Sequence, residues 1–290
     1  MCGPCVISLT LSRSSARRAT PPRRATVDPM SRRRLDTLLA ERGLATSRTS
    51  AAASVRAGHV RLGSGGRRAD KPGQLVAEDV ELSVSERPRY VSRGGVKLES
   101  AIRALDVPVE GRDCLDVGAS TGGFTDCLLQ HGAARVIALD VAYGQLDWGL
   151  RQDPRIEVVE RTNARHLGPD DLPYAAELVT VDVSFISLAK VLPAITRCLA
   201  PGGEALTLVK PQFELGRERV GKGGVVRDAA ARREAIVSAA RAAGELGLHV
   251  LGFARAGLPG PKGNRETFMW CALDRPGIED LEAAAHEVEP

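Results

Sequence analysis

Four charged side chains, two lysines and two carboxylates, stand at the ends of apolar stretches in this 290-residue sequence. Asp182 lies in "VTVDVSFISL", Lys210 in "LTLVKPQFE" and Glu266 in "KGNRETFMW", while Lys97 follows a flexible Arg93-Gly94-Gly95 on a predicted helix. A hydroxyl is a poor nucleophile until its proton is removed, and a lysine removes it only when neutral. Each residue alone also suits a structural ion pair. Gathered at one sheet edge, the four predict proton transfer from a hydroxyl.

A glycine turn in "LDVGASTGGFTDCLLQ" follows a predicted strand and opens a predicted helix. It lacks the G-x-G-x-x-G pattern with which a backbone approaches a pyrophosphate, and Asp116 precedes its first glycine. A carboxylate there would repel phosphate and accept hydrogen bonds from a neutral or cationic ligand. Asp140, at the end of the next strand, can hold ribose hydroxyls. We therefore expect S-adenosylmethionine, with a nicotinamide dinucleotide or no ligand as the alternatives.

The elements that must position these residues alternate between apolar strands and helices after Glu86. Such alternation predicts an α/β fold, a mostly parallel seven-stranded sheet covered on both faces, with ligands beyond the carboxyl ends of its strands. The predicted strands are 114–117, 136–139, 156–159, 178–183, 205–209, 250–254 and 267–272, and the main helices are 123–130, 188–199 and 229–243.

Charge divides the chain into a basic front and a mildly acidic body. Lys and Arg outnumber Asp and Glu by 5 to 1 in residues 1–30 and by 13 to 7 in residues 31–96, whereas residues 97–290 hold 22 against 28. This asymmetry predicts a polyanion-binding module joined to a body with another task. Residues 1–30 lack a periodic apolar face, and we expect them to be disordered, with Met30 as the true start.

Six cysteines give no metal-ligand spacing beyond a lone Cys2-x-x-Cys5, so we expect no metal. The other four lie in apolar segments, as reduced core thiols do.

Residues 31–86 predict a small α+β unit. Leu35, Leu38 and Leu39 have helical spacing, Gly43 can end that helix, and Ser47 can cap a second one that stops at Gly58. Short strands are predicted at 59–62, 74–76 and 80–84. Basic side chains decorate the unit and its border, and we expect those at Arg32, Arg33, Arg34, Arg48, Arg56, Arg61, Arg67, Lys71 and Arg93 to contact RNA.

This unit resembles the RNA-binding domain first described in ribosomal protein S4, through Arg34-Leu35-Asp36, Ser47-Arg48, Gly58-His59-Val60 and Lys71-Pro72. One departure is Gly63-Ser64-Gly65, where that family often has Asn-Gly. Lys97, Asp182, Lys210 and Glu266 match the tetrad of FtsJ-like ribose 2′-O-methyltransferases. Residues 31–273 as a whole resemble the TlyA family, also named hemolysin A, in "YVSRGGVKL", "DVAYGQLDW" and "VKPQFE".

The resemblance implies a Rossmann-like methyltransferase domain that modifies cytidine 2′-hydroxyls in small-subunit or large-subunit ribosomal RNA. It implies Lys210 as the base, Asp182 as the group that positions it, and Lys97 and Glu266 as groups that orient the ribose. The cofactor would contact Asp116, Gly118, Ser120, Thr121 and Gly122 around its methionine part, Asp140 at its ribose, and Asn163 and Ala164 at its adenine.

We expect an S4-like domain at 31–86, a linker at 87–96 that couples RNA docking to completion of the cofactor site, a methyltransferase domain at 97–275 and a tail at 276–290. We expect a cytoplasmic monomer. We expect no membrane contact, because no apolar run approaches the roughly 18 residues of a spanning helix. A non-catalytic RNA-binding or ribosome assembly factor and a pore-forming hemolysin remain alternatives of other classes.

Overall fold

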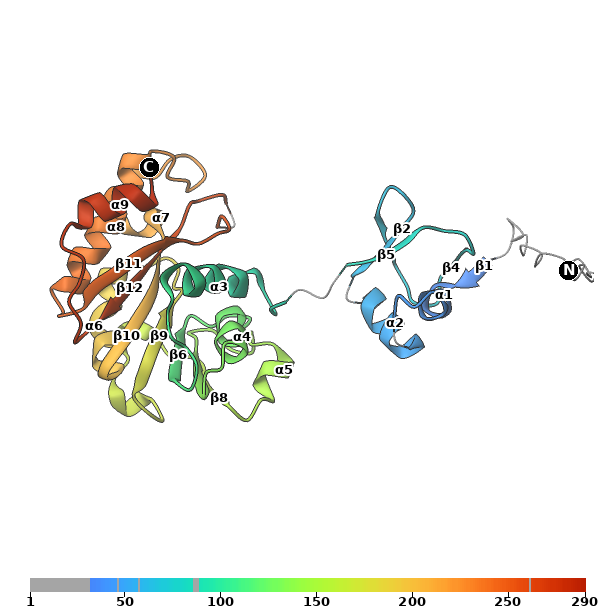
Figure 1. The fold of residues 1–290 in the computed structure, drawn as a ribbon, viewed down its shortest axis with the longest axis horizontal. Coiled ribbons are helices and arrows are strands. Elements are labelled where there is room, and N and C mark those ends of the chain that lie inside the picture. Colours follow the sequence, from blue (N-terminus) through green and yellow to red (C-terminus); the bar gives the residue numbers. More distant parts are fainter. Residues whose placement is uncertain (1–31, 46, 57, 86–88, 261) are drawn as a thin grey trace, which may run out of the picture. The chain divides into compact units, whose positions relative to one another are not determined.

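The computed structural model describes residues 32–45, 47–56, 58–85, 89–260 and 262–290. The described residues form two compact units, one within Met1–Arg87 and one within Pro88–Pro290 (Figure 1). The predictions for residues 1–30 and for the Cys2-x-x-Cys5 pair lie outside the described residues.

The described residues of the first unit form two helices and five short strands. Helices α1 (Leu35–Glu41) and α2 (Arg48–Arg56) agree with the sequence prediction, and the Ser50 amide donates to Ser47 Oγ at 3.1 Å, which confirms the cap. Strands β1 (Arg32–Arg34) and β4 (Leu75–Ala77) pair with each other, and β2 (Val60–Leu62) lies between β3 (Arg67–Arg68) and β5 (Leu82–Val84). The arginine runs of β1 and β3 were not predicted as strands because they show no apolar alternation.

The core of the first unit comes from the apolar side chains of both helices and of β2. Leu35, Leu39 and Val60 are completely buried, and Leu38 and Val55 nearly so. The leucines whose spacing predicted the first helix therefore form the buried face of α1. Most of the basic residues of the unit are exposed.

The second unit is built on one seven-stranded sheet, as predicted. Its order is β11-β12-β10-β9-β6-β7-β8, and β12 runs in the direction opposite to the other six strands. The strands are β6 (Asp113–Val117), β7 (Arg135–Leu139), β8 (Ile156–Val159), β9 (Ala176–Val181), β10 (Leu199–Val209), β11 (His249–Arg255) and β12 (Thr267–Ala272).

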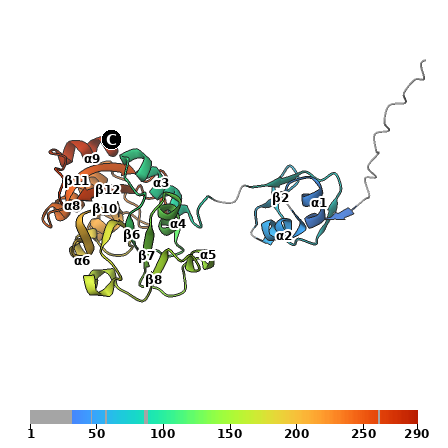
Figure 2. The ribbon, with the colours of Figure 1, turned by 60° about the horizontal axis from the view of Figure 1, so that its bottom comes forward.

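Helices cover both faces of this sheet, as Figures 1 and 2 show. Alternate residues along a strand serve opposite faces: Cys114 packs with α3 (Arg93–Leu105) and α4 (Gly123–Gln130), whereas Leu115 packs with α6 (Leu192–Cys198) and α8 (Ala229–Gly244). Cys114, Cys127, Cys198 and Cys271 are free and buried, which confirms the prediction of core thiols.

Shorter helices complete the unit. These are α5 (Trp148–Arg151), α7 (Pro211–Glu214) and α9 (Leu281–Val288), with 3-10 turns η1 (Ala164–His166), η2 (Pro169–Asp171), η3 (Leu188–Lys190) and η4 (Arg217–Arg219). The single helix predicted for 188–199 is wrong: η3 and α6 divide it, and Pro193 stands in the first turn of α6.

The prediction of a flexible Arg93-Gly94-Gly95 is also wrong. These residues form the first turn of α3, and the Gly94 amide donates to Ser92 Oγ at 3.3 Å. Gly95 is small for a packing reason, because a β-carbon there would lie 2.3 Å from Cγ of the buried Tyr90. The glycines therefore allow close packing at the start of the helix rather than mobility.

Candidate active site

The glycine turn connects β6 to α4 and brings the end of another strand against it. Gly118 has a φ of 88°, in the left-handed region, and a β-carbon on it would lie 2.6 Å from the Asp182 carbonyl oxygen. Only glycine satisfies both conditions. The turn therefore lies directly beside the residue that follows β9.

Two hollows meet at this turn. One, of about 590 Å³, is lined by Asp140, Asn163 and Ala164, and the other, of about 360 Å³, by Thr121 and Lys97. Gly118, Ser120 and Asp182 line both. Each volume lies in the range of roughly 300–1,000 Å³ that is usual for small-molecule sites. A ligand in the larger hollow can therefore reach the side chains of the smaller one.

Asp140 has a fixed orientation at the rim of the larger hollow. Its Oδ2 accepts a hydrogen bond from the Ser120 amide at 2.8 Å, and its Oδ1 accepts one from the Ala142 amide at 2.7 Å. Each carboxylate oxygen can accept a second hydrogen bond. The residue can therefore bind the hydroxyl groups of a ribose, so the hollow suits the adenosine of S-adenosylmethionine.

Two of the predicted cofactor residues do not line either hollow. Asp116 is completely buried and accepts hydrogen bonds from Thr125 Oγ1 at 2.7 Å and Thr180 Oγ1 at 3.3 Å. Burial raises the pKa of its carboxyl group to about 7. Gly122 faces Leu146 and Leu150 instead of the hollows. These two residues shape the turn from behind.

The predicted tetrad forms two ion pairs of buried lysines. Lys97 Nζ lies 2.5 Å from Glu266 Oε2, and Lys210 Nζ lies 2.5 Å from Asp182 Oδ1. Lys97, Lys210 and Glu266 are each less than a tenth exposed, while the Asp182 side chain is 26% exposed. Since Lys97 and Asp182 line the same hollow, one residue of each pair borders a common space.

Strand order explains how residues so distant in the sequence come together. Strands β9 and β10 are parallel neighbours, so Asp182 and Lys210 follow adjacent strand ends. Strand β12 is antiparallel to β10, with Thr267 opposite Val209, which places Glu266 at the same edge. Helix α3 then supplies Lys97.

Comparison with known proteins identifies the family. The model of the FtsJ-like methyltransferase family matches residues 90–272, and that of the S4 domain matches residues 33–82. A Mycobacterium tuberculosis protein named 16S/23S rRNA (cytidine-2'-O)-methyltransferase TlyA is 50% identical over 258 residues, which are 86% of this chain and 95% of that protein. This chain belongs to the TlyA family. It is a methyltransferase with an S4 domain.

Proteins that carry a hemolysin name are also similar to this chain. Hemolysin A of Brachyspira hyodysenteriae is 38% identical over 237 residues, or 80% of this chain and 97% of that protein. A solved structure from Streptococcus thermophilus, which also carries a hemolysin name, has a TM-score of 0.67 at 38% identity and covers 89% of this chain and 96% of its own. In the described part of this TlyA-family chain, no helix has the length and apolar character needed to cross a membrane.

The basic residues predicted to contact RNA separate into two places in this TlyA-family chain. Eight lie in the first unit, where Arg34 and Arg48 share the buried carboxylate of Asp36 and Arg33 pairs with Glu41. Arg93 lies instead in the second unit, where its guanidinium donates to the Pro259 carbonyl at 2.9 Å and lines the hollow of Lys97.

Two residues beside the tetrad were missed by the sequence analysis. Ser184 Oγ accepts a hydrogen bond from Lys210 Nζ at 3.0 Å. Phe185 has a φ of 65° and is 91% exposed, and its ring centroid lies 5.2 Å from that of Phe213. Both follow Asp182 in "VDVSFISL", but an apolar string predicts a buried phenylalanine. Exposure of Phe185 is a property of the folded loop.

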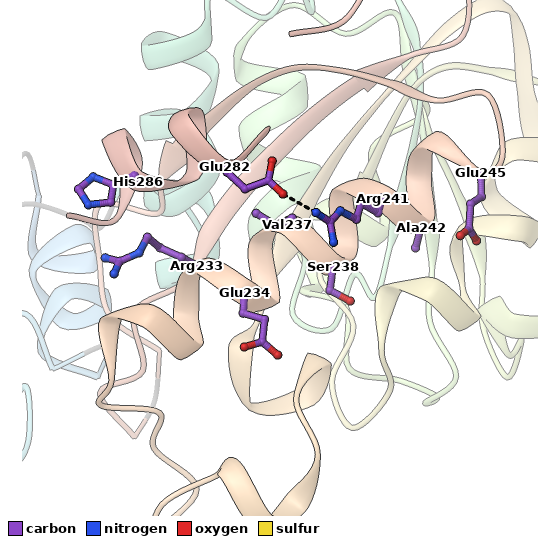
Figure 3. A pocket seen from close by; sticks show the side chains of 9 residues that line it. All are labelled: Arg233, Glu234, Val237, Ser238, Arg241, Ala242, Glu245, Glu282 and His286. Carbon is purple, nitrogen blue, oxygen red and sulfur yellow. Dashed lines mark hydrogen bonds and ion pairs between the residues drawn. The ribbon is translucent and has the colours of Figure 1, made fainter. Parts of the chain in front are cut away.

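A further hollow, of about 680 Å³, lies on the outer side of α8 and α9. Its lining carries charges of both signs, including Arg233, Glu234 and Arg241, and Glu282 of α9 pairs with Arg241 (Figure 3). None of the predicted site residues lines it. The predicted site residues therefore line smaller hollows than this one.

Proposed function

We propose that the chain is an S-adenosylmethionine-dependent ribosomal RNA methyltransferase that modifies the 2′-hydroxyl of cytidine in 16S RNA, 23S RNA or both. The observation that carries this proposal is the pair of lysine–carboxylate contacts at the hollow that borders the glycine turn. The name of the M. tuberculosis relative supports the substrate. Since that substrate is ribosomal, we place the protein in the cytoplasm, and we propose that it acts as a monomer.

S-adenosylmethionine supplies an electrophilic methyl group on a sulfonium. The residues suited to hold it are Gly118, Ser120 and Thr121 on the methionine side, with Asp140, Asn163 and Ala164 on the adenosine side. Because both hollows share Gly118 and Ser120, the turn holds methyl donor and ribose in one space. Such positioning of two partners contributes a large part of the rate.

Lys210 removes the hydroxyl proton in this proposal. In its neutral form Nζ accepts the proton while the ribose oxygen forms its bond to the methyl carbon and the carbon–sulfur bond breaks. The resulting ammonium is stabilised by Asp182, which lies 2.5 Å away, and donates to Ser184. Asp182 therefore acts on the lysine.

Lys97 and Glu266 orient the ribose. Each side chain neutralises the charge of the other. This pairing matters because Glu266 is only 4% exposed, and an unpaired buried charge would be costly. An ammonium beside the hollow can donate to a ribose oxygen, and Lys97 lines that hollow.

The test replaces the proposed base and an exposed lysine of the same unit. We expect Lys210→Ala to lower the rate of labelled methyl transfer to ribosomal RNA by about 10²–10⁴-fold, the usual contribution of a positioned base. Calorimetric titration with S-adenosylmethionine should show unchanged affinity, and the exposed Lys190→Ala should behave as wild type. Full transfer by Lys210→Ala would rule out its role.

Mapping of 2′-O-methyl marks on both ribosomal RNAs, with and without the protein, tests the substrate. Marks that depend on the protein should fall on cytidines. If wild-type protein binds ribosomal RNA but transfers no methyl group, it is a non-catalytic assembly factor instead.

A further inference from the structure

The segment that carries Glu266 borders a hollow on one side. Residues 256–266 join β11 to β12 and, where described, form neither helix nor strand. A hollow of about 370 Å³ adjoins this segment and is lined by Leu258, Pro259 and Glu266 on the segment and by Glu289 after α9. Side chains do not fill that space, so on this side the contacts of the segment with its neighbours are polar ones.

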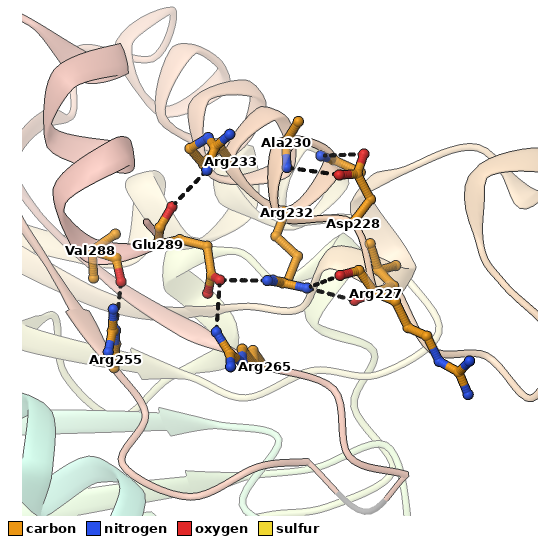
Figure 4. A network of polar contacts seen from close by, with 11 residues as sticks. Arg227, Asp228, Ala230, Arg232, Arg233, Arg255, Arg265, Val288 and Glu289 are labelled. Carbon is orange, nitrogen blue, oxygen red and sulfur yellow. Dashed lines mark hydrogen bonds and ion pairs between the residues drawn. The ribbon is translucent and has the colours of Figure 1, made fainter.

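Glu289 provides one such contact. The residue is 2% exposed, and its Oε1 accepts hydrogen bonds from Arg232 Nη2 at 2.6 Å and Arg265 Nη1 at 3.2 Å (Figure 4). Arg265 immediately precedes Glu266. The carboxylate of Glu289 is thus joined to the segment one residue before the tetrad.

Glu289 is also linked to the segment through hydrogen bonds of Arg232. This residue is 7% exposed, and its Nη1 donates to the carbonyl oxygens of Arg227 at 2.6 Å and Val226 at 3.2 Å. The Val226 amide in turn donates to Asn264 Oδ1 at 2.9 Å. Glu289 therefore also reaches the segment through Arg232, the backbone of 226–227 and Asn264.

The backbone beside Glu289 adds further ties. Arg233 Nη1 donates to the Glu289 carbonyl at 3.0 Å, and Arg255 Nε donates to the Val288 carbonyl at 2.7 Å (Figure 4). Arg255 is the last residue of β11, at the start of the segment. Both ends of the segment are thus connected to residues 288–289.

We propose that Glu289 is a positioning residue that fixes where Glu266 meets Lys97. The inference rests on the proposed function and adds a residue that does not touch the reacting groups. A buried ion pair is weak as a net stabiliser, because desolvation offsets its attraction. The location of the Glu289 contacts is informative, because Arg265 belongs to the segment of Glu266 and Arg232 is linked to it through Val226 and Asn264.

The first experiment measures the segment directly, by hydrogen exchange of the full-length protein. Glu289→Gln keeps the side-chain shape and removes the charge, so amide exchange in 256–266 should increase about tenfold or more. The matched control is Glu282→Gln in α9, which removes an exposed pair with Arg241 and should leave the segment unchanged. Equal exchange in Glu289→Gln and wild type overturns the proposal.

The second experiment separates positioning from general stability. Because small displacements of a catalytic group reduce rate strongly, we expect Glu289→Gln to lower kcat for methyl transfer about tenfold. The KM for RNA and the affinity for S-adenosylmethionine should change less than about twofold, since the glycine turn does not contact Glu289. If Glu289 only stabilised the fold in general, kcat and the affinity for S-adenosylmethionine would fall and the KM for RNA would rise together, and that result also overturns the proposal.

Arg265→Gln is a second, milder variant that also tests the proposal where Glu289→Gln does not fold, and where both fold it can be combined with Glu289→Gln. The Arg265 side chain is 65% exposed, so its loss removes one route at small cost. We expect a smaller loss of kcat, and the double variant should match Glu289→Gln alone because both act through one contact. Additive losses contradict that route. If wild-type protein transfers no methyl group, the proposed function fails, while hydrogen exchange still decides whether Glu289 positions the segment.

Discussion

Asp116, which the sequence predicts as a cofactor contact, is completely buried in the structure. A carboxylate before a glycine turn suits a ligand contact, yet this one lies behind the turn, with hydroxyl donors from Thr125 and Thr180. Complete burial raises the pKa of the carboxyl group from an ordinary 3.8 to about 7. The folded protein therefore holds a proton that the unfolded chain releases between about pH 4 and 7.

This raised pKa predicts a specific pH dependence of stability. The folded state binds the proton more tightly, so the contribution of Asp116 is fully present below about pH 4 and is lost as pH rises to about 7. Asp116→Asn does not titrate. Its free energy of unfolding, measured relative to that of wild type, should therefore increase by at least about 1 kcal/mol between pH 4.5 and 7.5. Urea denaturation at both pH values measures this, and a constant difference would show an ordinary carboxyl group.

The conformation of the glycine turn is local, whereas its contact with the end of β9 depends on the order of the strands. Its φ of 88° at Gly118 belongs to the turn itself, whereas the approach to the Asp182 carbonyl depends on β9 lying beside β6. The same strand order places Lys210 beside Asp182. The turn and the tetrad are therefore held by one set of backbone pairings.

Gly118→Ala tests this close approach. A β-carbon would meet the Asp182 carbonyl at 2.6 Å, so the turn and the end of β9 must separate. We expect affinity for S-adenosylmethionine to fall about tenfold or more and stability to fall by about 2–4 kcal/mol.

Gly111→Ala is the matched control for that substitution, because Gly111 has a φ of 75° and nothing within 4 Å of a β-carbon. It should lose about 1–2 kcal/mol from the backbone alone and keep its cofactor affinity. Calorimetry and thermal unfolding give both quantities. Equal affinities in the two variants would show that the approach to Asp182 does not matter for binding.

At the scale of the whole molecule, we propose that the two units have different tasks. The first has its own apolar core surrounded by basic side chains, and the second holds the hollows and both lysine–carboxylate pairs. RNA affinity and methyl transfer should therefore respond to different substitutions.

Arg61→Gln with Arg67→Gln tests this division, since both side chains are exposed on neighbouring strands. We expect RNA affinity to fall and the slope of log affinity against log salt to decrease by about 2, because each lost phosphate contact contributes about 1. Cofactor affinity should not change. Arg155→Gln, an exposed arginine of the second unit, is the control. An unchanged salt slope would place RNA binding elsewhere.

The sequence by itself determined much of this protein. Periodicity predicted the strands 156–159 and 267–272 and the helix 123–130 with the observed bounds. It succeeded because apolar spacing, caps and glycines act over a few neighbouring residues. The family followed from motif strings, and the types of the four tetrad residues followed from charges at strand ends.

Only the tertiary structure decided which of those charges pair. Lys97 and Glu266 are 169 residues apart, and no local signal joins them. Burial of Asp116, exposure of Phe185 and the contact of Glu289 with Arg232 likewise depend on which elements pack together. Residue 289 lay in a segment predicted as a tail, because an eight-residue helix has too few turns to show its buried face. Strand order and packing, which are long-range, set these contacts, and for that reason local spacing does not encode them.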